Sequence, residues 1–418
     1  MSDDRSPMTP FTSMRTLYLC YFGLREPLVQ TQVLPYLRQL AAQGIEVYLL
    51  TFEPNLSSAW QPTQLAETRA ALKAEGIRWH CRAYHKSPSA PATLYDVLFG
   101  AATAIRLARR HQIKVLHARA HMALAMALLA RPLTGSRVIF DVRGLMADEY
   151  ADAGRWREGS AVYRSVKWLE RVGLRRADQL VVLTRRMRDW IVAQGFADAE
   201  KIEVIPCCVD PERFAGQNGT ADSAIAKPER FELVYAGAVT GLYLLEEIAR
   251  FFLAVQARRR DAFLRILTKS DEAEAAATLR RVGLQDNDFW IGAVPPAEVP
   301  SYLRRARLGL SLRKPTFAQI ASSPTKIPEY LLAGLPVVSN VGVGDTDELL
   351  ERERVGVVLR SFDDDALVAA AEQALTLTDD VALRARCIEV ARRQFDLVSV
   401  GGFGYGNVYR RISVQTTH

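Results

Sequence analysis

A lysine and a glutamate lie three residues apart in the segment Ala321 to Asn340 (ASSPTKIPEYLLAGLPVVSN), at the start of a predicted helix. Because Pro328 lacks an N–H group and is costly deep inside a helix, the helix should begin near Ser323 to Thr325. Its first turn then presents backbone N–H groups and the charge of Lys326 to a phosphate, with Glu329 on the same face. This predicts a site for a diphosphate and sugar hydroxyls; the alternative is a capped helix with a surface ion pair.

A second polar cluster, His117, Arg119 and His121, lies at the end of the predicted strand Val115 to His117. Alternate residues of a strand share one face, so these three side chains should point the same way. The carboxyl ends of parallel strands are where α/β proteins bind ligands, and the pattern favours a site over simple packing. His117 and His121 are the two histidines of this expected site.

Four charged residues follow the next predicted strand, Val138 to Asp141. They are Asp141, Arg143, Asp148 and Glu149. Because they also follow a strand end, we expect them to belong to a site, and the alternative is a surface salt-bridge network.

Three consecutive acids, Asp363 to Asp365, could suggest a metal site. They precede the apolar stretch Ala366 to Leu375, and aspartate at a helix start is a cap, so no metal is predicted there. The five cysteines are scattered and form no CxxC pair. Adjacent Cys207 and Cys208 are interpreted as small residues at a strand end.

The elements that must position these residues alternate along the chain as short apolar runs and longer amphipathic segments, which is typical of parallel sheets covered by helices. Small, polar, turn-rich residues at 215–228 predict a linker. The fold class is therefore α/β, with two doubly wound Rossmann-like domains and a ligand expected in the cleft between them. The predicted divisions are a disordered leader (1–13), an N-terminal Rossmann-like domain (14–214), the linker (215–228), a C-terminal Rossmann-like domain (229–394) and a C-terminal helix (395–418) that packs back on the first domain.

The composition is that of a globular protein. The 418 residues are 49% hydrophobic and 24% charged, which excludes fibrous and disordered classes. No apolar run approaches the roughly 20 residues that cross a bilayer, and no signal peptide is recognised, so a cytoplasmic location is predicted.

The net charge of +7 is unevenly distributed. Residues 1–215 contain 29 basic and 21 acidic residues, a net charge of +8, which leaves −1 for the remainder. This predicts an anionic partner for the first half. Segment 155–176 (RWREGSAVYRSVKWLERVGLRR) mixes seven basic residues with aromatic ones and could lie on the inner face of an anionic membrane, or be an ordinary solvated helix face. No nucleic-acid recognition module is visible, so a nucleic-acid binder is the disfavoured alternative.

The order of several motifs resembles the GT-B glycosyltransferases, specifically the retaining glycosyltransferase family 4 (group 1). The motifs are LLTFE (Leu49 to Glu53), LHARAH (Leu116 to His121), FDVRG (Phe140 to Gly144), ADE (Ala147 to Glu149), IEVIPCCVD (Ile202 to Asp210), YAG (Tyr235 to Gly237) and EYLLAGLPVVS (Glu329 to Ser339). The resemblance runs through most of the chain.

The resemblance implies a donor site in the second domain. Glu329 would hydrogen-bond the ribose of a nucleotide-sugar, Ser322, Ser323 and Pro324 to Lys326 would contact its diphosphate, and Lys326 and Glu329 would serve catalysis. Relatives often have another glutamate where this chain has Ala321, and a basic pair after the first strand of this domain, where this chain has Gly237 to Gly241. Lys269 or Arg313 could supply the missing charge.

For the first domain, the resemblance implies that the turn after the first strand approaches the donor. This loop holds a single glycine, Gly23, and Arg25 could bind an anionic group there. The histidine beside the donor sugar corresponds to His121, which makes it the expected catalytic residue, with His117 as its competitor. The resemblance also implies that this first domain is the acceptor domain, and that its charged residues at a strand end, Asp141, Arg143, Asp148 and Glu149, face the acceptor or the donor sugar.

The implied reaction is retaining, metal-independent transfer of a hexose from a nucleotide-diphosphate sugar, with no other cofactor. The acceptor would be a glycan or a lipid-linked molecule of polysaccharide or glycoconjugate biosynthesis. A GT-B sugar-nucleotide epimerase, which needs no acceptor, is the main alternative.

Overall fold

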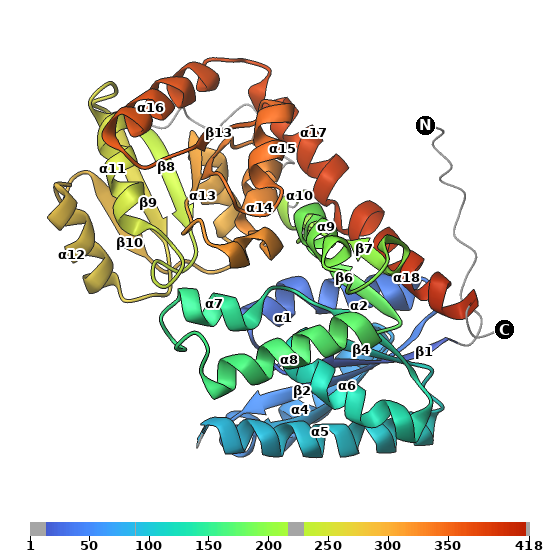
Figure 1. The fold of residues 1–418 in the computed structure, drawn as a ribbon. Helices are drawn as coiled ribbons and strands as arrows, with labels where there is room; N and C mark the ends of the chain where they lie inside the picture. Colours follow the sequence, from blue (N-terminus) through green and yellow to red (C-terminus); the bar gives the residue numbers. More distant parts are fainter. Residues whose placement is uncertain (1–13, 88, 216–229, 415–418) are drawn as a thin grey trace. The chain divides into compact units, whose positions relative to one another are not determined.

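Two separate parallel sheets organise the chain in the computed structural model, which describes residues 14–87, 89–215 and 230–414 (Figure 1). Contacts divide it into two units. Unit 1 comprises residues 1–147, 159–205 and 397–418, and unit 2 comprises 148–158 and 206–396. The predicted leader, and the predicted linker from residue 216 onward, lie outside the described residues.

Unit 1 contains a seven-stranded sheet in the order β3-β2-β1-β4-β5-β6-β7. Its strands are β1 (Arg15–Cys20), β2 (Glu46–Pro54), β3 (Ile77–Tyr84), β4 (Val115–Arg119), β5 (Arg137–Asp141), β6 (Gln179–Val182) and β7 (Ile202–Val204). Central strands such as β1 and β4 are buried on both faces, which explains their continuous apolar runs. The order reverses between β1 and β4, so polar residues at their carboxyl ends lie at a topological switch point.

Helices connect the strands of unit 1. They are α1 (Pro27–Gln32), α2 (Leu34–Ala42), α3 (Leu56–Ala59), α4 (Pro62–Ala74), α5 (Ser89–His111), α6 (Ala120–Thr134), α8 (Ala161–Arg176) and α9 (Arg185–Ala193), with a 3-10 turn at Ala199–Lys201. The helix α7 (Met146–Asp152) spans the boundary between the units.

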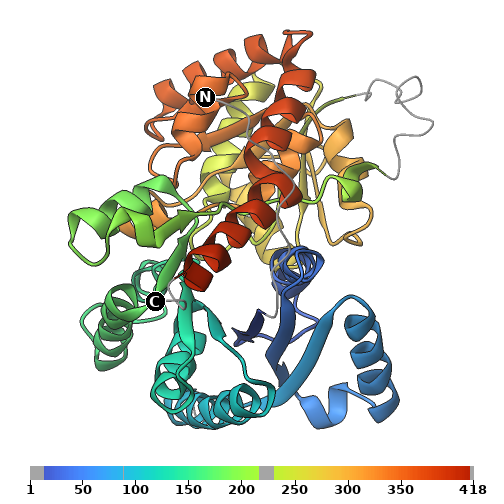
Figure 2. The same cartoon turned by 90° about the vertical axis from the view of Figure 1, so that its right-hand side faces the viewer.

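The C-terminal segment joins unit 1 through a π-helix (Leu397–Gly402) and α18 (Phe403–Val414), shown in red in Figure 2. The hydroxyl groups of Tyr409 and Thr16 are 2.8 Å apart, and Gln43 donates a hydrogen bond to the Gly402 carbonyl. This segment therefore packs against β1 and the end of α2.

Unit 2 contains a six-stranded sheet in the order β10-β9-β8-β11-β12-β13. Its strands are β8 (Phe231–Ala236), β9 (Ala262–Leu267), β10 (Phe289–Gly292), β11 (Leu308–Ser311), β12 (Val337–Asn340) and β13 (Gly356–Leu359). Its helices are α10 (Glu212–Ala215), α11 (Leu245–Gln256), α12 (Glu272–Val282), α13 (Val299–Arg305), α14 (Lys326–Leu332), α15 (Thr346–Glu353), α16 (Asp364–Thr378) and α17 (Leu383–Phe395), with a 3-10 turn at Phe317–Ala321. Here the switch point lies between β8 and β11.

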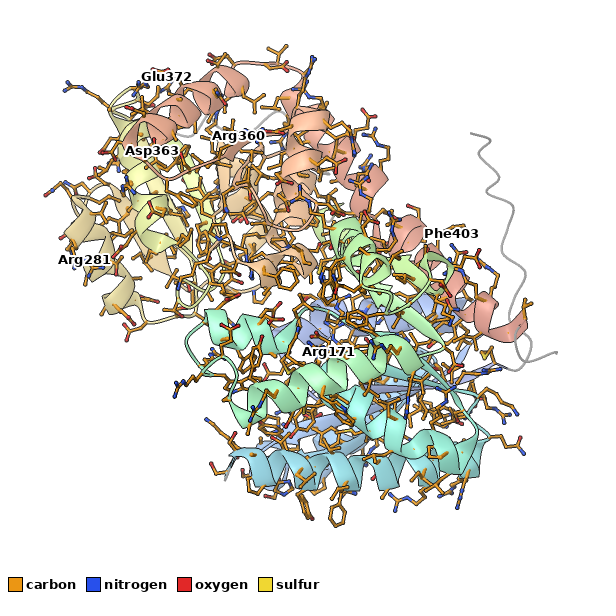
Figure 3. All side chains as sticks on the ribbon, in the orientation of Figure 1. Arg171, Arg281, Arg360, Asp363, Glu372 and Phe403 are labelled. Atoms are coloured by element: carbon orange, nitrogen blue, oxygen red, sulfur yellow. The ribbon has the colours of Figure 1, made fainter. Side chains whose placement is uncertain are left out.

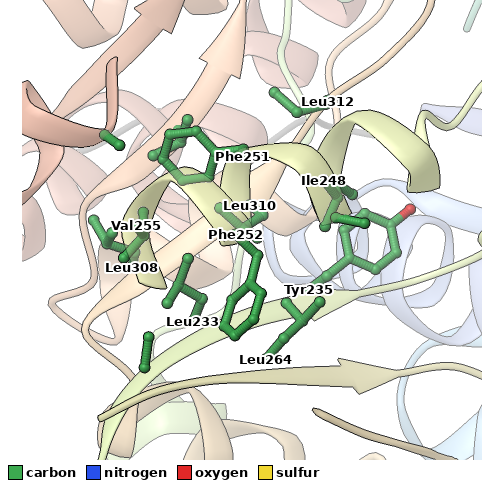
Figure 4. Packing of buried hydrophobic residues seen from close by; sticks show 14 of the residues in the cluster. Leu233, Tyr235, Ile248, Phe251, Phe252, Val255, Leu264, Leu308, Leu310 and Leu312 are labelled. Carbon is green, nitrogen blue, oxygen red and sulfur yellow. The ribbon is translucent and has the colours of Figure 1, made fainter. Parts of the chain in front are cut away.

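The core of unit 2 forms where the apolar face of α11 meets the sheet. Phe251 and Phe252 are fully buried in the same cluster as Leu233, Leu264 and Leu310 of the three central strands (Figure 4). Burying two phenylalanine side chains contributes roughly 2–3 kcal/mol each, so this cluster gives a rigid base to the strand ends above it.

Apolar runs predict nine strands, at 16–21, 47–52, 115–117, 138–141, 180–183, 233–236, 263–267, 308–312 and 336–339. All nine are present, and the four described strands that were not expected are β3, β7, β10 and β13. These four are the edge strands of the two sheets. Edge strands expose side chains on one side and so lack a continuous apolar run; β3 reads IRWHCRAY, with six of its eight residues at least partly exposed.

The described helices also bear on two expectations from the sequence, one about membrane-spanning segments and one about Asp363. None of the described helices has the length and apolar character needed to span a bilayer. Asp363 accepts a hydrogen bond from the Ala366 backbone N–H at 2.9 Å and caps α16, which confirms its interpretation as a helix cap.

Candidate functional site

The polar groups of unit 2 gather at the switch point between β8 and β11. Gly237 follows β8, has a φ of 132°, and its N–H donates to the Leu267 carbonyl at 2.9 Å. Arg313 follows β11, and its N–H donates to Asn340 Oδ1 at 2.9 Å. The backbones of Arg313 and Tyr243 form an isolated bridge, so the loops after β8 and β11 are held together here.

Lys326, the first residue of α14, brings its amine close to residues at the end of β8 and in the loop that follows it. Its side chain is 7% exposed, and its Nζ lies 3.8 Å from the ring centroid of Tyr235 and 4.6 Å from that of Tyr243. A Cβ on Gly237 would come within 3.2 Å of the same Nζ, so a larger residue at this position would crowd the amine. The predicted start of the helix is confirmed, because Thr325 is the N-cap.

The amino group of Lys326 has no hydrogen-bond partner among the residues that the structure describes. Burial, together with the nearby charge of Arg313, holds the pKa of Lys326 well below its ordinary value. A buried amine without an anion is unfavourable. The group is therefore prepared to gain a strong interaction when an anionic oxygen approaches it.

Other polar atoms close in sequence to Lys326 share this property. Within the described chain, buried atoms without a hydrogen-bond partner include Ser311 Oγ, Arg313 Nε, Thr316 Oγ1 and both amide atoms of Gln319. Native proteins leave few such atoms, and each needs an explanation. Their concentration between β11 and α14 favours a segment that binds a polar molecule.

Glu329 is paired with a residue that the sequence did not suggest. Arg213 of α10 donates a hydrogen bond to Glu329 Oε1 at 3.1 Å. Burial raises the pKa of Glu329, and the Arg213 guanidinium opposes that rise. The alternative of a surface ion pair between Lys326 and Glu329 is wrong, because Glu329 bonds Arg213 and Lys326 is buried against two tyrosines.

The serines before α14 are partly used by the fold. Ser323 Oγ accepts a hydrogen bond from the Cys207 N–H at 3.1 Å, and Ser322 is buried with its N–H donating to the Gln319 carbonyl. Pro324 closes the turn by accepting the Ile327 N–H at 3.1 Å. The Thr325 side chain makes no cap hydrogen bond.

The two candidate cations differ in position. The guanidinium of Arg313 lies 5.0 Å from the Tyr243 ring centroid, and its charge acts on Lys326. Lys269, after β9, is exposed. Arg313 is thus the cation that the structure brings to Lys326. Ala321 is buried at the end of the 3-10 turn.

In unit 1, His117 and Arg119 point toward Asp141 at the carboxyl ends of β4 and β5. The shortest nitrogen–oxygen distances to Asp141 are 3.9 Å from His117 Nε2 and 3.6 Å from Arg119 Nη1. All three are buried, and burial lowers the pKa of His117 to about 4. Tyr405 of α18 donates the closest hydrogen bond to Asp141, at 2.9 Å. This is a buried charge network that joins the C-terminal helix to the sheet.

The expectation that His121 shares the strand face of His117 and Arg119 is wrong. The strand ends at Arg119, Ala120 takes a φ of 61°, and His121 belongs to α6. His121 is fully buried, and its Nε2 lies 3.1 Å from Glu170 Oε2 of α8. The period of the strand cannot be continued through a residue that starts a helix.

The residues expected near the first strand of unit 1 are engaged in packing. A Cβ on Gly23 would come within 2.8 Å of Pro54 Cδ, so the glycine permits close contact with β2. Arg25 donates hydrogen bonds to the Ala59 carbonyl and to Gln64, and its guanidinium lies 3.7 Å from the Trp60 ring centroid.

The remaining expected residues lie at the start of α7. Asp148 and Glu149 are half-buried in its first turn, where carboxylates interact favourably with a helix N-terminus. Arg143 has a positive φ of 60°, and its Nη1 lies 3.8 Å from Asp141 Oδ1.

Three residues of the unit 2 site were missed in the sequence. Arg213 is 116 residues from its partner Glu329, and no local spacing links them. Tyr235 lies in the YAG motif, which indicates only the end of a strand. Tyr243 follows a glycine-containing turn, and nothing in the local sequence indicates that it contacts Lys326.

Comparisons with known proteins agree with this architecture. Residues 29–208 match the family described as Glycosyl transferase 4-like domain, and residues 231–377 match Glycosyl transferases group 1. The 2-deoxystreptamine glucosyltransferase of Streptomyces kanamyceticus is 27% identical over 192 residues, which are 42% of this chain and 46% of that protein. The match therefore spans less than half of the relative's length.

Two solved structures illustrate the shared fold. HepE of Anabaena, in complex with UDP, has a TM-score of 0.67 at 15% identity, covering 95% of this chain and 100% of that one. It has also been solved with UDP-glucose. A candidate UDP-N-acetylglucosamine 2-epimerase of Listeria monocytogenes has a TM-score of 0.60 at 12% identity, covering 97% of each chain.

Proposed function

Because the chain belongs to the group 1 glycosyltransferases of the GT-B fold, we propose that it transfers a hexose, with retention of configuration, from a nucleotide-diphosphate sugar to a glycan or lipid-linked acceptor. One observation carries the proposal. The buried Nζ of Lys326, without a hydrogen-bond partner among the described residues, lies at the β8–β11 switch point of unit 2.

The donor's diphosphate would lie against Lys326 and Arg313, beside the backbone of Gly237, Thr325 and Ser323. The low pKa of Lys326 supports this assignment, because an arriving diphosphate would favour the charged amine and gain its interaction in a place that excludes water. HepE, which has been solved with UDP and with UDP-glucose, supports a nucleotide-sugar as the ligand class.

Glu329 would accept hydrogen bonds from the ribose hydroxyls. A carboxylate accepts two such bonds well, and the hydrogen bond from Arg213 would keep Glu329 ionised and oriented in spite of its burial.

In the proposed reaction, the acceptor hydroxyl attacks the anomeric carbon from the face that the diphosphate leaves. The bond between the anomeric carbon and the phosphate oxygen breaks, and the acceptor proton passes to that leaving oxygen. Lys326 and Arg313 would stabilise the charge that develops on the diphosphate, which gives the protein its own cations for this task and makes transfer metal-independent. His121 is not given a step in this scheme; its Nε2 lies 3.1 Å from Glu170 Oε2, and its Nδ1 has no hydrogen-bond partner among the described residues.

The acceptor is proposed from the charge of the chain. The excess of +8 in residues 1–215 supports an anionic or membrane-bound acceptor of polysaccharide or glycoconjugate biosynthesis, with the protein peripheral on the inner face of the membrane. The same charge would also attract nucleic acid, for which no recognition module supports a role.

A sugar-nucleotide epimerase is the second candidate, supported by the fold likeness to the Listeria protein. The two functions differ in their products. A transferase releases nucleoside diphosphate in proportion to added acceptor, whereas an epimerase interconverts nucleotide-sugars without one.

The test is a thermal-shift screen of nucleotide-sugars, beginning with UDP-glucose, followed by product analysis with and without acceptor saccharides. We expect one donor class to raise the melting temperature and to release nucleoside diphosphate when acceptor is present. Stabilisation by none of the nucleotide-sugars would refute the donor site, and acceptor-independent epimerisation would replace the transferase.

A further inference from the structure

Three helices of unit 1, α5, α6 and α8, lie side by side (Figure 1). Their side chains line a groove that the proposed chemistry does not use. The groove has a volume of about 1050 Å³. Its walls are mainly apolar, with Leu94 and Val97 from α5, Leu128 and Leu129 from α6, and Trp168 and Val172 from α8. It is a surface feature of one unit, so it does not depend on the other.

The rim of this groove exposes large apolar side chains. Trp168 is 66% exposed, Leu94 is 60% exposed and Leu133 is 54% exposed. Tyr95, Leu98 and Phe99 of α5 are exposed as well, and the rings of Tyr95 and Phe99 pack on each other at a centroid distance of 4.2 Å. Contiguous exposed apolar residues of this kind mark a contact surface rather than the scattered exposure that is normal for a soluble protein.

The charges on the same three helices all have one sign at the surface. Their sequences contain nine lysines and arginines and two acids, and the acids Asp96 and Glu170 are both buried. Among the described residues, Arg164, Arg171 and Arg176 take part in no ion pair (Arg171 is labelled in Figure 3). Arg131 is the exception on the rim, because it pairs with Asp178 at 3.1 Å.

We propose that the face formed by α5, α6 and α8, here called the basic groove face, binds an anionic lipid surface. Trp168 and the apolar rim would lie at the boundary between headgroups and acyl chains, and the arginines would contact lipid phosphates. Amphipathic tryptophan beside arginines with long aliphatic stems is the combination that binds at such an interface.

The alternatives fit this face less well. A second copy of the chain would bring the same cationic rim against itself, which is repulsive. Nucleic acid would use the arginines but leave the exposed leucines and the apolar groove in water. Only an anionic lipid surface satisfies both the charge and the apolar area.

The basic groove face also differs from the segment 155–176 suggested by sequence. Arg155 lies 5.4 Å from the Tyr150 ring centroid, and Trp156 packs on Tyr150 at a centroid distance of 4.6 Å, both within unit 2. Only the α8 part of the segment contributes, and α5 and α6 complete the surface. The inference deepens the acceptor side of the proposed function, since it brings the enzyme to where a lipid-linked acceptor is found.

The test is flotation of the full chain with vesicles of phosphatidylcholine alone or mixed with phosphatidylglycerol. We expect binding only to the anionic vesicles, weakened by salt. The double variant Arg164→Ala/Arg171→Ala should lower the partition coefficient roughly 25-fold, from about fivefold per arginine. Trp168→Ala should lower it several-fold at unchanged charge.

The matched controls carry the same changes on unit 2 and on α18. Arg281→Ala/Arg360→Ala removes two exposed arginines of unit 2, and Phe403→Ala removes an exposed aromatic of α18 (Figure 3). Both controls should bind vesicles like the unchanged protein.

Three results would overturn the inference: no binding to anionic vesicles at low salt, equal losses in test and control variants, or a concentration-dependent dimer that Trp168→Ala dissociates. Nucleotide-sugar stabilisation of the same preparations separates this outcome from a failure of the proposed function, because the flotation needs no donor.

Discussion

Replacing Lys326 with methionine removes a charge while keeping the length of the side chain. A unit charge about 4 Å from another is worth about 4 kcal/mol at an effective dielectric constant of about 20. Loss of one preorganised group that stabilises developing charge lowers kcat by about 10²–10³-fold. We therefore expect Lys326→Met to lose about two to three orders of magnitude in transfer rate.

The same substitution should leave the fold intact or more stable. The amine of Lys326 is buried against Tyr235 and Tyr243 and has no hydrogen-bond partner in the described part of the chain, so its removal exposes no unsatisfied group. Because the folded-state pKa of Lys326 lies well below its ordinary value of 10.5, the unfolded chain binds more protons than the folded one between those two values. The free energy of unfolding should therefore increase as pH rises between the folded-state pKa of Lys326 and 10.5, and this pH dependence should be lost in Lys326→Met.

The assay is nucleoside diphosphate release with the donor that stabilises the protein, together with urea unfolding at several pH values. Lys269→Met is the matched control, since it removes an exposed lysine of the same unit and should keep wild-type turnover. Turnover of Lys326→Met within about threefold of wild type, against the expected 10²–10³, would refute the donor-site reasoning. A marked drop in stability would refute the description of an unpartnered buried amine.

Further outcomes test other parts of the two units. Glu329→Gln should raise the KM for the donor and lower kcat/KM about 10–100-fold, as expected for losing hydrogen bonds to a charged group, with unfolding followed to verify the fold. Gly237→Ala should weaken donor binding about tenfold, because a Cβ would come within 3.2 Å of the lysine amine. Gly283→Ala is the control, because Gly283 has a similar positive φ but its Cβ would make only an ordinary 3.8 Å contact. It should cost about 1–3 kcal/mol of stability without affecting donor binding. Tyr405→Phe should cost about 1–3 kcal/mol in urea unfolding because buried Asp141 loses its 2.9 Å hydrogen bond, and an unchanged midpoint would show that the network does not hold α18.

The central strands were readable from the sequence because both faces of a parallel sheet are buried. That condition demands a continuous apolar run, as in β1 and β2. Edge strands such as β3 and β10 do not meet this condition, since most of their side chains are partly or fully exposed. The C-terminal helix was expected as a single element, but the chain takes a π-helix at Leu397–Gly402 before α18.

The candidate site divides in the same way. Pro328 limits where α14 can begin, so local chemistry was enough to put Lys326 in its first turn and Glu329 one turn later. The partners of those residues were not readable. Arg213 belongs to α10, 116 residues before Glu329 in the sequence. The expectation for His121 failed because the strand period was extended past the point where a helix starts.

Local sequence thus specified the strands and helices and the helix that carries Lys326 and Glu329, because propensity and proline geometry act over a few residues. It also specified the sign of the charge on residues 1–215, because net charge needs no geometry. Tertiary structure decided which groups meet. It put an amine against two tyrosine rings, paired Glu329 with an arginine, and gathered apolar side chains of three helices, with arginines of α6 and α8, around one groove. Those contacts arise from the order of strands in a sheet and from helix packing, and neither is encoded within any single segment.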